Sequence, residues 1–196
     1  MANIELPAPA DRTIHLTGTI DETASENFIR KVDEIDAYDI TMATNTLIHV
    51  NSLGFDATAY TPPPIKVVIN SPGGYIYDAL SIYDTIDGRQ DMVCVATGKC
   101  MSAATFILLA FPNELRLATA NTTFMLHSVS SMTYGKTATM EEDLKETKRL
   151  QKVMDGIYTS RSTIPKELLE EIHKTKKDLY LTAKEALKYN IISKII

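Results

Sequence analysis

The chain has 196 residues, a hydrophobic fraction of 44% and a formal net charge of −5 at pH 7. This length suits one domain with a hydrophobic core, and the acidic balance offers no basic surface for nucleic acid. The longest apolar run falls far short of the roughly 20 residues that span a bilayer, and the start, MANIELPAPADR, lacks the regions of a signal peptide. We therefore expect a single cytoplasmic domain over residues 1–196, with no membrane or nucleic-acid partner.

The cysteines and histidines show no metal-binding spacing. Cys94 and Cys100 form no CxxC motif, and the four histidines are scattered along the chain. We expect no bound metal and no cofactor. Two lone cysteines also fit a reducing cytosol.

Runs of β-branched and apolar residues predict five strands, at 13–20, 66–70, 92–98, 115–119 and 123–127. The runs at 66–70 and 92–98 are typical of strands buried on both faces. Helical spacing predicts helices at 21–35 and 75–86, and another that begins at Ser102 and that Pro112 closes. Strands that alternate with helices predict an α/β fold with a largely parallel sheet.

The C-terminal third is predominantly helical in pattern. An apolar stripe from 138 to 161 predicts one long helix, which packs either against another subunit or along its own domain. Pro165 suits the first turn of a further helix. The T-x-x-E sequence at 182–185 is a capping box for a last helix, with Asn190 as a left-handed stop.

The stretch from 37 to 64 breaks this organisation. Its polar and turn-forming residues, which end in TPPP, predict an elaborated surface connection with a strand at TLIHV (46–50). We expect an insertion within the domain and not a second domain.

Two turns before helices are candidate functional elements. SPGG at 71–74 can point backbone N–H groups at an incoming oxygen, although a tight turn alone also needs glycine. In ATGKCMS, Ser102 lies at a predicted helix start, where it is either a nucleophile or an N-cap. The N–H of Ala103 behind it can donate to an oxyanion.

His127 and Asp178 are candidates for the remaining roles. His127 ends an apolar strand where the chain turns polar, which suits a general base, or a half-buried histidine bonded to backbone. Asp178 precedes the last helix and can orient an imidazole or pair with Lys176 or Lys177. If His127 is the base, activity rises as its imidazole loses a proton and then holds at mildly alkaline pH.

Together these motifs resemble the Clp protease proteolytic subunit (ClpP) family. The resemblance rests on INSPGG at 69–74, G-x-x-x-S from Gly98 to Ser102, FMLH at 124–127 and D-x-x-x-T/S-A-x-E-A from Asp178 to Ala186, in this order, with IYDTI at 82–86 and YGKTAT at 134–139. It implies that Ser102 is the nucleophile, His127 the general base and Asp178 the residue that orients the histidine. The N–H groups of Gly74 and Ala103 then form the oxyanion hole.

The same resemblance implies an architecture and partners. It implies a crotonase-like spiral of β-β-α units, with helix 138–161 as a protruding handle through which two heptameric rings stack and enclose a chamber. Unfolded polypeptides or short peptides are then the substrates, paired as an added strand with the stretch 132–137. No cofactor is implied, and ATP enters only through a partner AAA+ unfoldase.

Several features depart from the family pattern. About eleven residues precede the first strand, fewer than usual, which weakens the case for an unfoldase partner. SVS follows His127 where the family has a proline, Cys100 and Met101 replace small residues, and 37–64 has no counterpart. These departures indicate a divergent member, for which a phage origin is one hypothesis.

Three alternatives to a serine peptidase remain at this stage. The first is an acyl-CoA enzyme of the crotonase kind, which needs carboxylates near the acyl carbon and neither serine nor histidine. The second is a catalytically silent ring component, and the third is a cysteine peptidase that uses Cys100.

Overall fold

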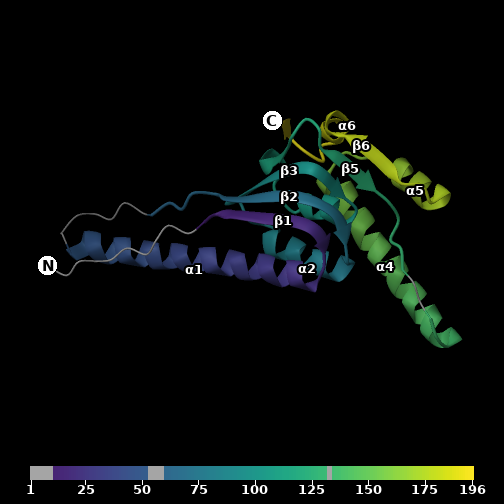
Figure 1. Ribbon diagram of the computed structural model, residues 1–196, viewed down its shortest axis with the longest axis horizontal. Helices are drawn as coiled ribbons and strands as arrows, with labels where there is room; N and C mark the ends of the chain where they lie inside the picture. The colour runs from purple at the N-terminus through teal and green to yellow at the C-terminus, as the bar shows by residue number, and fades with distance from the viewer. Residues whose placement is uncertain (1–10, 53–59, 132–133) are drawn as a thin grey trace.

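A computed structural model describes residues 11–52, 60–131 and 134–196 as a mixed α/β fold (Figure 1). The strands are β1 (Thr13–Ile20), β2 (Ile65–Gly74), β3 (Met92–Met101), β4 (Arg116–Ala118), β5 (Thr123–Leu126), β6 (Leu179–Thr182) and β7 (Lys194–Ile195). The helices are α1 (Glu22–Ser52), α2 (Ile76–Ile86), α3 (Ala103–Leu108), α4 (Thr137–Arg161), α5 (Lys166–Thr175) and α6 (Ala183–Lys188), with a 3₁₀ turn, η1, at Asn113–Leu115.

The sheet is largely parallel, as the sequence predicts. Strands β1, β2, β3, β4 and β7 lie in this order, and each neighbouring pair is parallel. β5 runs parallel to the second half of β3, and β6 pairs with β5 in the antiparallel sense. The α/β class is therefore confirmed, whereas β6 and β7 are short strands that the sequence patterns did not predict.

A common bend crosses three neighbouring strands. The β1–β2 pairing changes register at Gly18, the β2–β3 pairing changes at Asn70, and β3 leaves β4 for β5 around Gly98. Both glycines have a positive φ (77° and 59°), which glycine adopts at little cost. Beyond these positions, the strand segments at 71–74, 99–101 and 123–126 lie side by side.

Helices cover one face of β1, β2 and β3. α1 and α2 lie along that face in Figure 1, and every residue of α3 is buried between them and the sheet. β2 consequently alternates: Val67 and Ile69 are fully buried, whereas Lys66 and Asn70 are exposed. The prediction that 66–70 is buried on both faces is thus wrong, since helices cover only one side of this strand in the single chain.

α1 is the largest correction to the sequence-based expectation. The helix continues through Ser52, so the predicted strand at 46–50 and the irregular connection from 37 to 52 are both wrong. The hydroxyls of Thr41 and Thr44 donate to the carbonyls of Ala37 and Ile40, each at 2.8 Å, so these β-branched residues are accommodated within the helix. The rest of the predicted insertion, at 53–59, lies outside the described residues.

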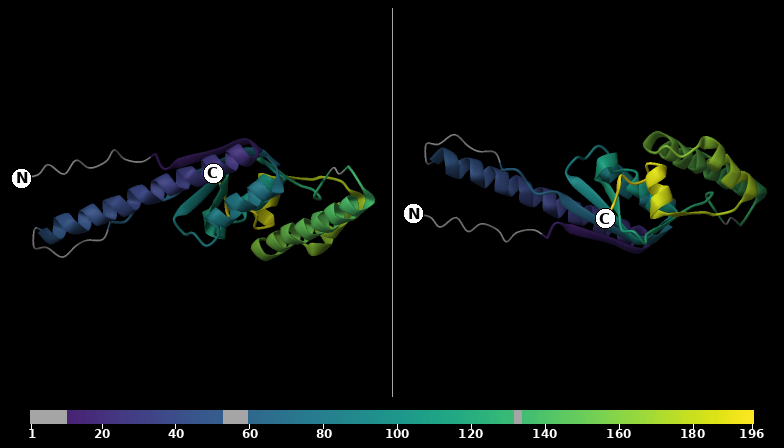
Figure 2. Two further views of the ribbon diagram at one scale, coloured as in Figure 1. Left: turned by 90° about the horizontal axis from the view of Figure 1, so that it is seen from below. Right: turned by 90° about the horizontal axis from the view of Figure 1, so that it is seen from above.

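The two long helices project from opposite ends of the sheet. α1 extends beyond β1 and β2 at one end, and α4 extends away at the other (Figure 2). In α4 the buried side chains, Leu150, Met154 and Tyr158, all lie in the second half of the helix. The first half, which contains Met140 and Leu144, is exposed, and the predicted helix at 138–161 is confirmed.

The shorter elements agree with the sequence patterns in most details. Thr182 and Glu185 form the predicted capping box of α6, and Asn190 has a positive φ of 54°. α3 ends at Leu108 and not at Pro112, because a turn and η1 take up the residues that follow. Within the described ranges, no helix combines the length and the apolar character that crossing a membrane requires.

Candidate active site

Ser102 lies at a sharp turn between β3 and α3. Its backbone has φ 52° and ψ −125°, a region that non-glycine residues rarely adopt. Its N–H donates to the carbonyl of Met125 at 2.7 Å, and its own carbonyl accepts from the N–H of Thr105 at 2.9 Å. The side chain makes no capping hydrogen bond to α3, so the alternative role as a helix N-cap is wrong.

Thr105 braces this turn from inside the core. It is fully buried, and its hydroxyl lies 2.8 Å from the carbonyl of Cys100 and 3.3 Å from that of Met125. One side chain therefore links β3, α3 and β5 directly below Ser102. Because buried hydroxyls are found with partners, the sequence signal for this role is a polar residue inside the apolar run AATFIL.

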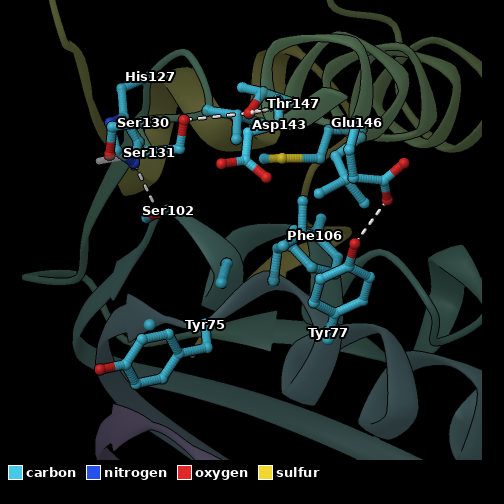
Figure 3. A pocket seen from close by; sticks show the side chains of 16 residues that line it. Tyr75, Tyr77, Ser102, Phe106, His127, Ser130, Ser131, Asp143, Glu146 and Thr147 are labelled. Atoms are coloured by element: carbon cyan, nitrogen blue, oxygen red, sulfur yellow. Dashed lines mark hydrogen bonds between the residues drawn. The ribbon is translucent and has the colours of Figure 1, made fainter. Parts of the chain in front are cut away.

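The Ser102 side chain is paired with His127. Its Oγ lies 2.7 Å from His127 Nε2, across the gap between the end of β3 and the end of β5 (Figure 3). This pairing holds two residues that are 25 positions apart in the chain. A hydroxyl in hydrogen-bond contact with a neutral imidazole can transfer its proton to the ring when it attacks a carbonyl.

Asp178 is close to His127 in the topology but does not contact it. Leu126 of β5 pairs with Leu179 of β6, so the next positions outward in this antiparallel ladder are His127 and Asp178. Asp178 is exposed, and among the described residues it forms neither a hydrogen bond with His127 nor an ion pair with Lys176 or Lys177.

The predicted oxyanion residues lie beside Ser102. Gly74 and Ala103 both line the cavity that opens at Ser102 and His127. At Gly74, an added β-carbon would lie 2.0 Å from the carbonyl oxygen of Ile20, so only glycine fits there. The sequence pattern predicts that SPGG is a turn after the strand. In the structure, these four residues instead form the end of strand β2.

Gly73 is a site residue that the sequence pattern did not single out. Its φ is 94°, and an added β-carbon would lie 2.6 Å from Ser102 Cβ and 2.9 Å from the nitrogen of Ala103. The backbone of β2 thus packs directly against the serine turn. The doubled glycine in SPGG was the available signal, since one glycine alone suffices for a tight turn.

The cavity beside Ser102 has an apolar floor and a polar rim. Its volume is about 640 Å³, and Phe106, Leu150 and Met154 lie at its base. On the rim, the Tyr77 hydroxyl donates to Glu146 at 2.5 Å and so links α2 to α4 (Figure 3). Hydrogen bonds from Arg149 and Tyr77 lower the pKa of Glu146 to about 2, so this carboxylate is charged at neutral pH.

Cys100 cannot serve as a neutral-pH nucleophile in this arrangement. Its side chain is fully buried and its Sγ lies 3.4 Å from the carbonyl of Ala104. Burial raises the pKa of the thiol to about 12, which keeps it protonated. In the part of the chain that the structure describes, no group of three or more His, Cys, Asp or Glu side chains is arranged to hold a metal ion.

A family profile and individual relatives both match this chain to Clp proteases. The Clp protease family profile matches residues 58–196. The ATP-dependent Clp protease proteolytic subunit of Deinococcus radiodurans is 33% identical over 135 residues, which cover 67% of this chain and 64% of that protein. Proteolytic subunit 3 of Rhizobium johnstonii is 34% identical and that of Rhizobium meliloti 33% identical, each over 134 residues, which cover 67% of this chain and 68% and 67% of the relatives.

The aligned region is about two thirds of the length of each of these proteins. The profile match includes the turn at Ser102, the strand before His127 and the long helix α4. A family profile that matches well over half of the chain, together with relatives at about one-third identity, establishes common descent. The chain belongs to the Clp protease family.

Proposed function

We propose that this chain is a serine endopeptidase with Ser102 as its nucleophile and His127 as its general base. The observation that carries the proposal is the 2.7 Å contact between Ser102 Oγ and His127 Nε2, on a turn that exposes the serine to an apolar cavity. Membership of the Clp protease family supports the same chemistry.

The proposed reaction starts with attack on a peptide carbonyl. Ser102 Oγ forms a bond to the carbonyl carbon while His127 Nε2 takes the hydroxyl proton. The imidazolium then gives that proton to the leaving amine as the C–N bond breaks, which leaves an acyl group on Ser102. Water, deprotonated by His127, hydrolyses the ester and regenerates the serine.

Backbone donors stabilise the charge that develops on the carbonyl oxygen. The N–H groups of Gly74 and Ala103 are the proposed oxyanion hole, because both residues border the cavity next to Ser102. Loss of one such donor typically lowers kcat by about 10²–10³. The close approach of Gly73 to Ser102 keeps the two donor segments together.

Asp178 is proposed to orient His127 in the active form. The ladder between β5 and β6 supports this role, because its last pair is Leu126 with Leu179, the chain neighbours of His127 and Asp178. The contact itself requires the carboxylate to turn from its exposed position toward the free ring nitrogen. A carboxylate there fixes the tautomer and stabilises the imidazolium.

The substrates and the assembly follow from the family. We propose that unfolded polypeptides or short peptides bind along the stretch 132–137 as an added strand, in a chamber formed by two stacked heptameric rings of a crotonase-like spiral fold. Of this stretch, 132 and 133 lie outside the described residues. The exposed first half of α4 supports contact between copies through this helix. The relatives are named as subunits of an ATP-dependent protease, which supports an AAA+ unfoldase as partner.

Labelling with a fluorophosphonate probe tests the proposed nucleophile. The wild-type chain should be labelled at Ser102 and should cleave a fluorogenic peptide, whereas Ser102→Ala should do neither. His127→Ala should retain its fold and lose peptide hydrolysis. Unchanged turnover in His127→Ala would remove the histidine from the mechanism, and turnover of an acyl-CoA panel in place of peptides would favour a crotonase-type reaction.

A further inference from the structure

A second set of polar residues lies directly beyond His127. Ser128 Oγ is 3.0 Å from His173 Nδ1, and His173 Nε2 is 3.0 and 3.1 Å from the two carboxylate oxygens of Asp155. Gln151 Nε2 donates to Asp155 at 3.0 Å, and Gln151 Oε1 accepts from the N–H of Val129 at 2.7 Å. Because Ser128 and Val129 are consecutive, these five residues form a closed circuit, here called the polar ring.

The polar ring joins three parts of the fold. Asp155 and Gln151 belong to the inner half of α4, and His173 belongs to α5. Ser128 and Val129 are the first two residues after His127, and they have left the β5–β6 ladder, whose last pair is Leu126 with Leu179. The ring therefore holds the chain at the point where sheet hydrogen bonds stop holding it.

The hydrogen bonds of His173 in the polar ring can form with either a neutral or a charged imidazole. With a neutral imidazole, Nε2–H donates to Asp155 and Nδ1 accepts from the Ser128 hydroxyl. With an imidazolium, both nitrogens donate, and Ser128 Oγ becomes the acceptor. All five residues are half-buried, so water competes only partly for these contacts.

The serine, histidine and aspartate of the ring do not make a second active site. The cavity that borders His173 and Asp155 does not include Ser128, and the cavity at Ser102 includes Val129 but neither Ser128 nor His173. A nucleophile needs a substrate cavity and oxyanion donors next to it, which the described contacts do not provide at Ser128. The circuit is better explained as a support for the neighbouring site.

We propose that His173 is a positioning residue for His127, acting through Ser128 and Val129. His127 has Ser102 on one side and no bond to Asp178, so its ring orientation depends on the backbone that follows it. A displacement of about 1 Å in a reacting group can lower a rate by roughly 10²-fold. The effect of His173 on catalysis rests on the proposed function, whereas its effect on the position of the His127 ring does not.

Three substitutions at His173 separate its contact with Ser128 from its contact with Asp155. His173→Gln retains a donor that can reach Asp155 and gives up Ser128, whereas His173→Asn retains a partner for Ser128 and gives up Asp155. His173→Phe removes both contacts at similar volume. The matched control is His15→Phe, at an exposed position on β1 away from both cavities that concern the site.

The first measurement is the rate constant for labelling of Ser102 by the fluorophosphonate, with the labelled fraction recorded separately. A positioning role predicts that His173→Phe lowers the rate constant about 10- to 100-fold at an unchanged labelled fraction, with the Gln and Asn variants in between. A merely structural role would lower the labelled fraction and leave the rate constant of the labelled sites unchanged. If His173→Phe does not fold, the Gln and Asn variants and Ser128→Ala decide the outcome.

The second measurement does not depend on catalysis. In protein labelled with ¹³C-histidine, the four histidines give few ring signals, and the His127 signal is assigned by its loss in His127→Ala. The inference predicts that this signal moves in His173→Gln and stays in place in His15→Phe. A His127 signal that does not move in any His173 variant overturns the inference, even if wild-type peptidase activity is present. A signal that moves in a chain without peptidase activity supports the inference and rejects the proposed function.

Discussion

At the residue scale, the site depends on how closely two backbones approach each other. Ser102 takes a positive φ that serine rarely adopts, and buried hydrogen bonds to Met125 and Thr105 compensate for the strain. Gly73 gives the turn the space that it needs, because no side chain fits between β2 and Ser102. The serine can face the cavity only while both conditions hold.

Gly73→Ala should therefore damage both stability and catalysis. The added methyl group would lie 2.6 Å from Ser102 Cβ and 2.7 Å from the carbonyl oxygen of Met101, so the serine turn must shift. We expect a loss of about 1–3 kcal/mol in the free energy of unfolding and a large loss of probe labelling at Ser102. Gly88→Ala is the control, since Gly88 has a similar φ of 83° but nothing within 4 Å. Equal labelling in both variants would show that the close approach is unimportant.

The catalytic candidates could be predicted from the sequence, whereas their supports could not. Ser102 and His127 lie in short motifs whose spacing is characteristic, so the resemblance was enough to pair them before any distance was known. A polar residue inside an apolar run marks Thr105 as unusual but does not identify its partner Met125, 20 positions away, and no local pattern signals the contact of His173 with Ser128, 45 positions away. The exposed side chain of Asp178 was equally beyond the reach of a motif, because a motif gives position and not rotamer.

At the element scale, α1 shows how tertiary context overrides local propensity. Isoleucine, valine and threonine are frequent from 40 to 50 and favoured a strand, but no glycine or proline interrupts the chain from 19 to 53. Among the side chains of α1 that the structure describes, the large apolar ones buried in the core are Phe28, Val32 and Ile35, all in the first half of the helix. Beyond them, Asp39 in the middle of α1 pairs with Arg12 at 2.7 Å and accepts from the Tyr60 hydroxyl, two residues of the segments that precede β1 and β2.

An ionic cluster centred on Arg89 gives a contribution to stability that depends on pH. Arg89 forms two hydrogen bonds with Asp36 of α1 and two with Asp91. The hydrogen bonds from Arg89 lower the pKa of Asp91 below its ordinary value of 3.8. A depressed carboxylate pKa contributes stability that is present above pH 3.8 and lost as the pH falls through the folded-state value.

Arg89→Gln should therefore destabilise the protein most near neutral pH. Urea unfolding of wild type and variant from pH 6 to pH 2.5 should give a difference in free energy that is constant above about pH 4 and shrinks below it. Arg30→Gln, which removes an exposed ion pair with Glu34 and a hydrogen bond to Asn27, should show a small difference at every pH. A difference for Arg89→Gln that grows toward low pH would contradict this explanation.

At the scale of the whole molecule, the outer half of α4 leaves two apolar side chains exposed. Met140 and Leu144 are four residues apart on this helix and are 43% and 53% exposed, which places two apolar side chains on one surface. The proposed stacking of rings through α4 would bury them. The inner half of the same helix carries Gln151 and Asp155 of the polar ring, so the proposed assembly contact and the proposed support of His127 both involve α4.

Leu144→Glu should consequently reduce the size of the assembly. Analytical ultracentrifugation should show smaller particles for this variant, because burial of a charged side chain in an apolar contact is costly. Lys145→Glu, a change of charge at the next position on another side of the helix, should leave the size closer to that of wild type. Identical particle sizes for Leu144→Glu and wild type would remove α4 from the assembly contact.

The bend across β1, β2 and β3 separates the end of the sheet that carries the candidate site from the end at which β2 begins. Gly74, Ser102 and His127 come from strand segments beyond the bend, and their spacing is set by the register of those strands. α1 and the segment after it connect the last residue of β1, Ile20, to the first residue of β2, Ile65. Additional sequence in the connection between α1 and β2, such as a reporter or a recruitment domain inserted in the laboratory, should therefore not displace the atoms that react.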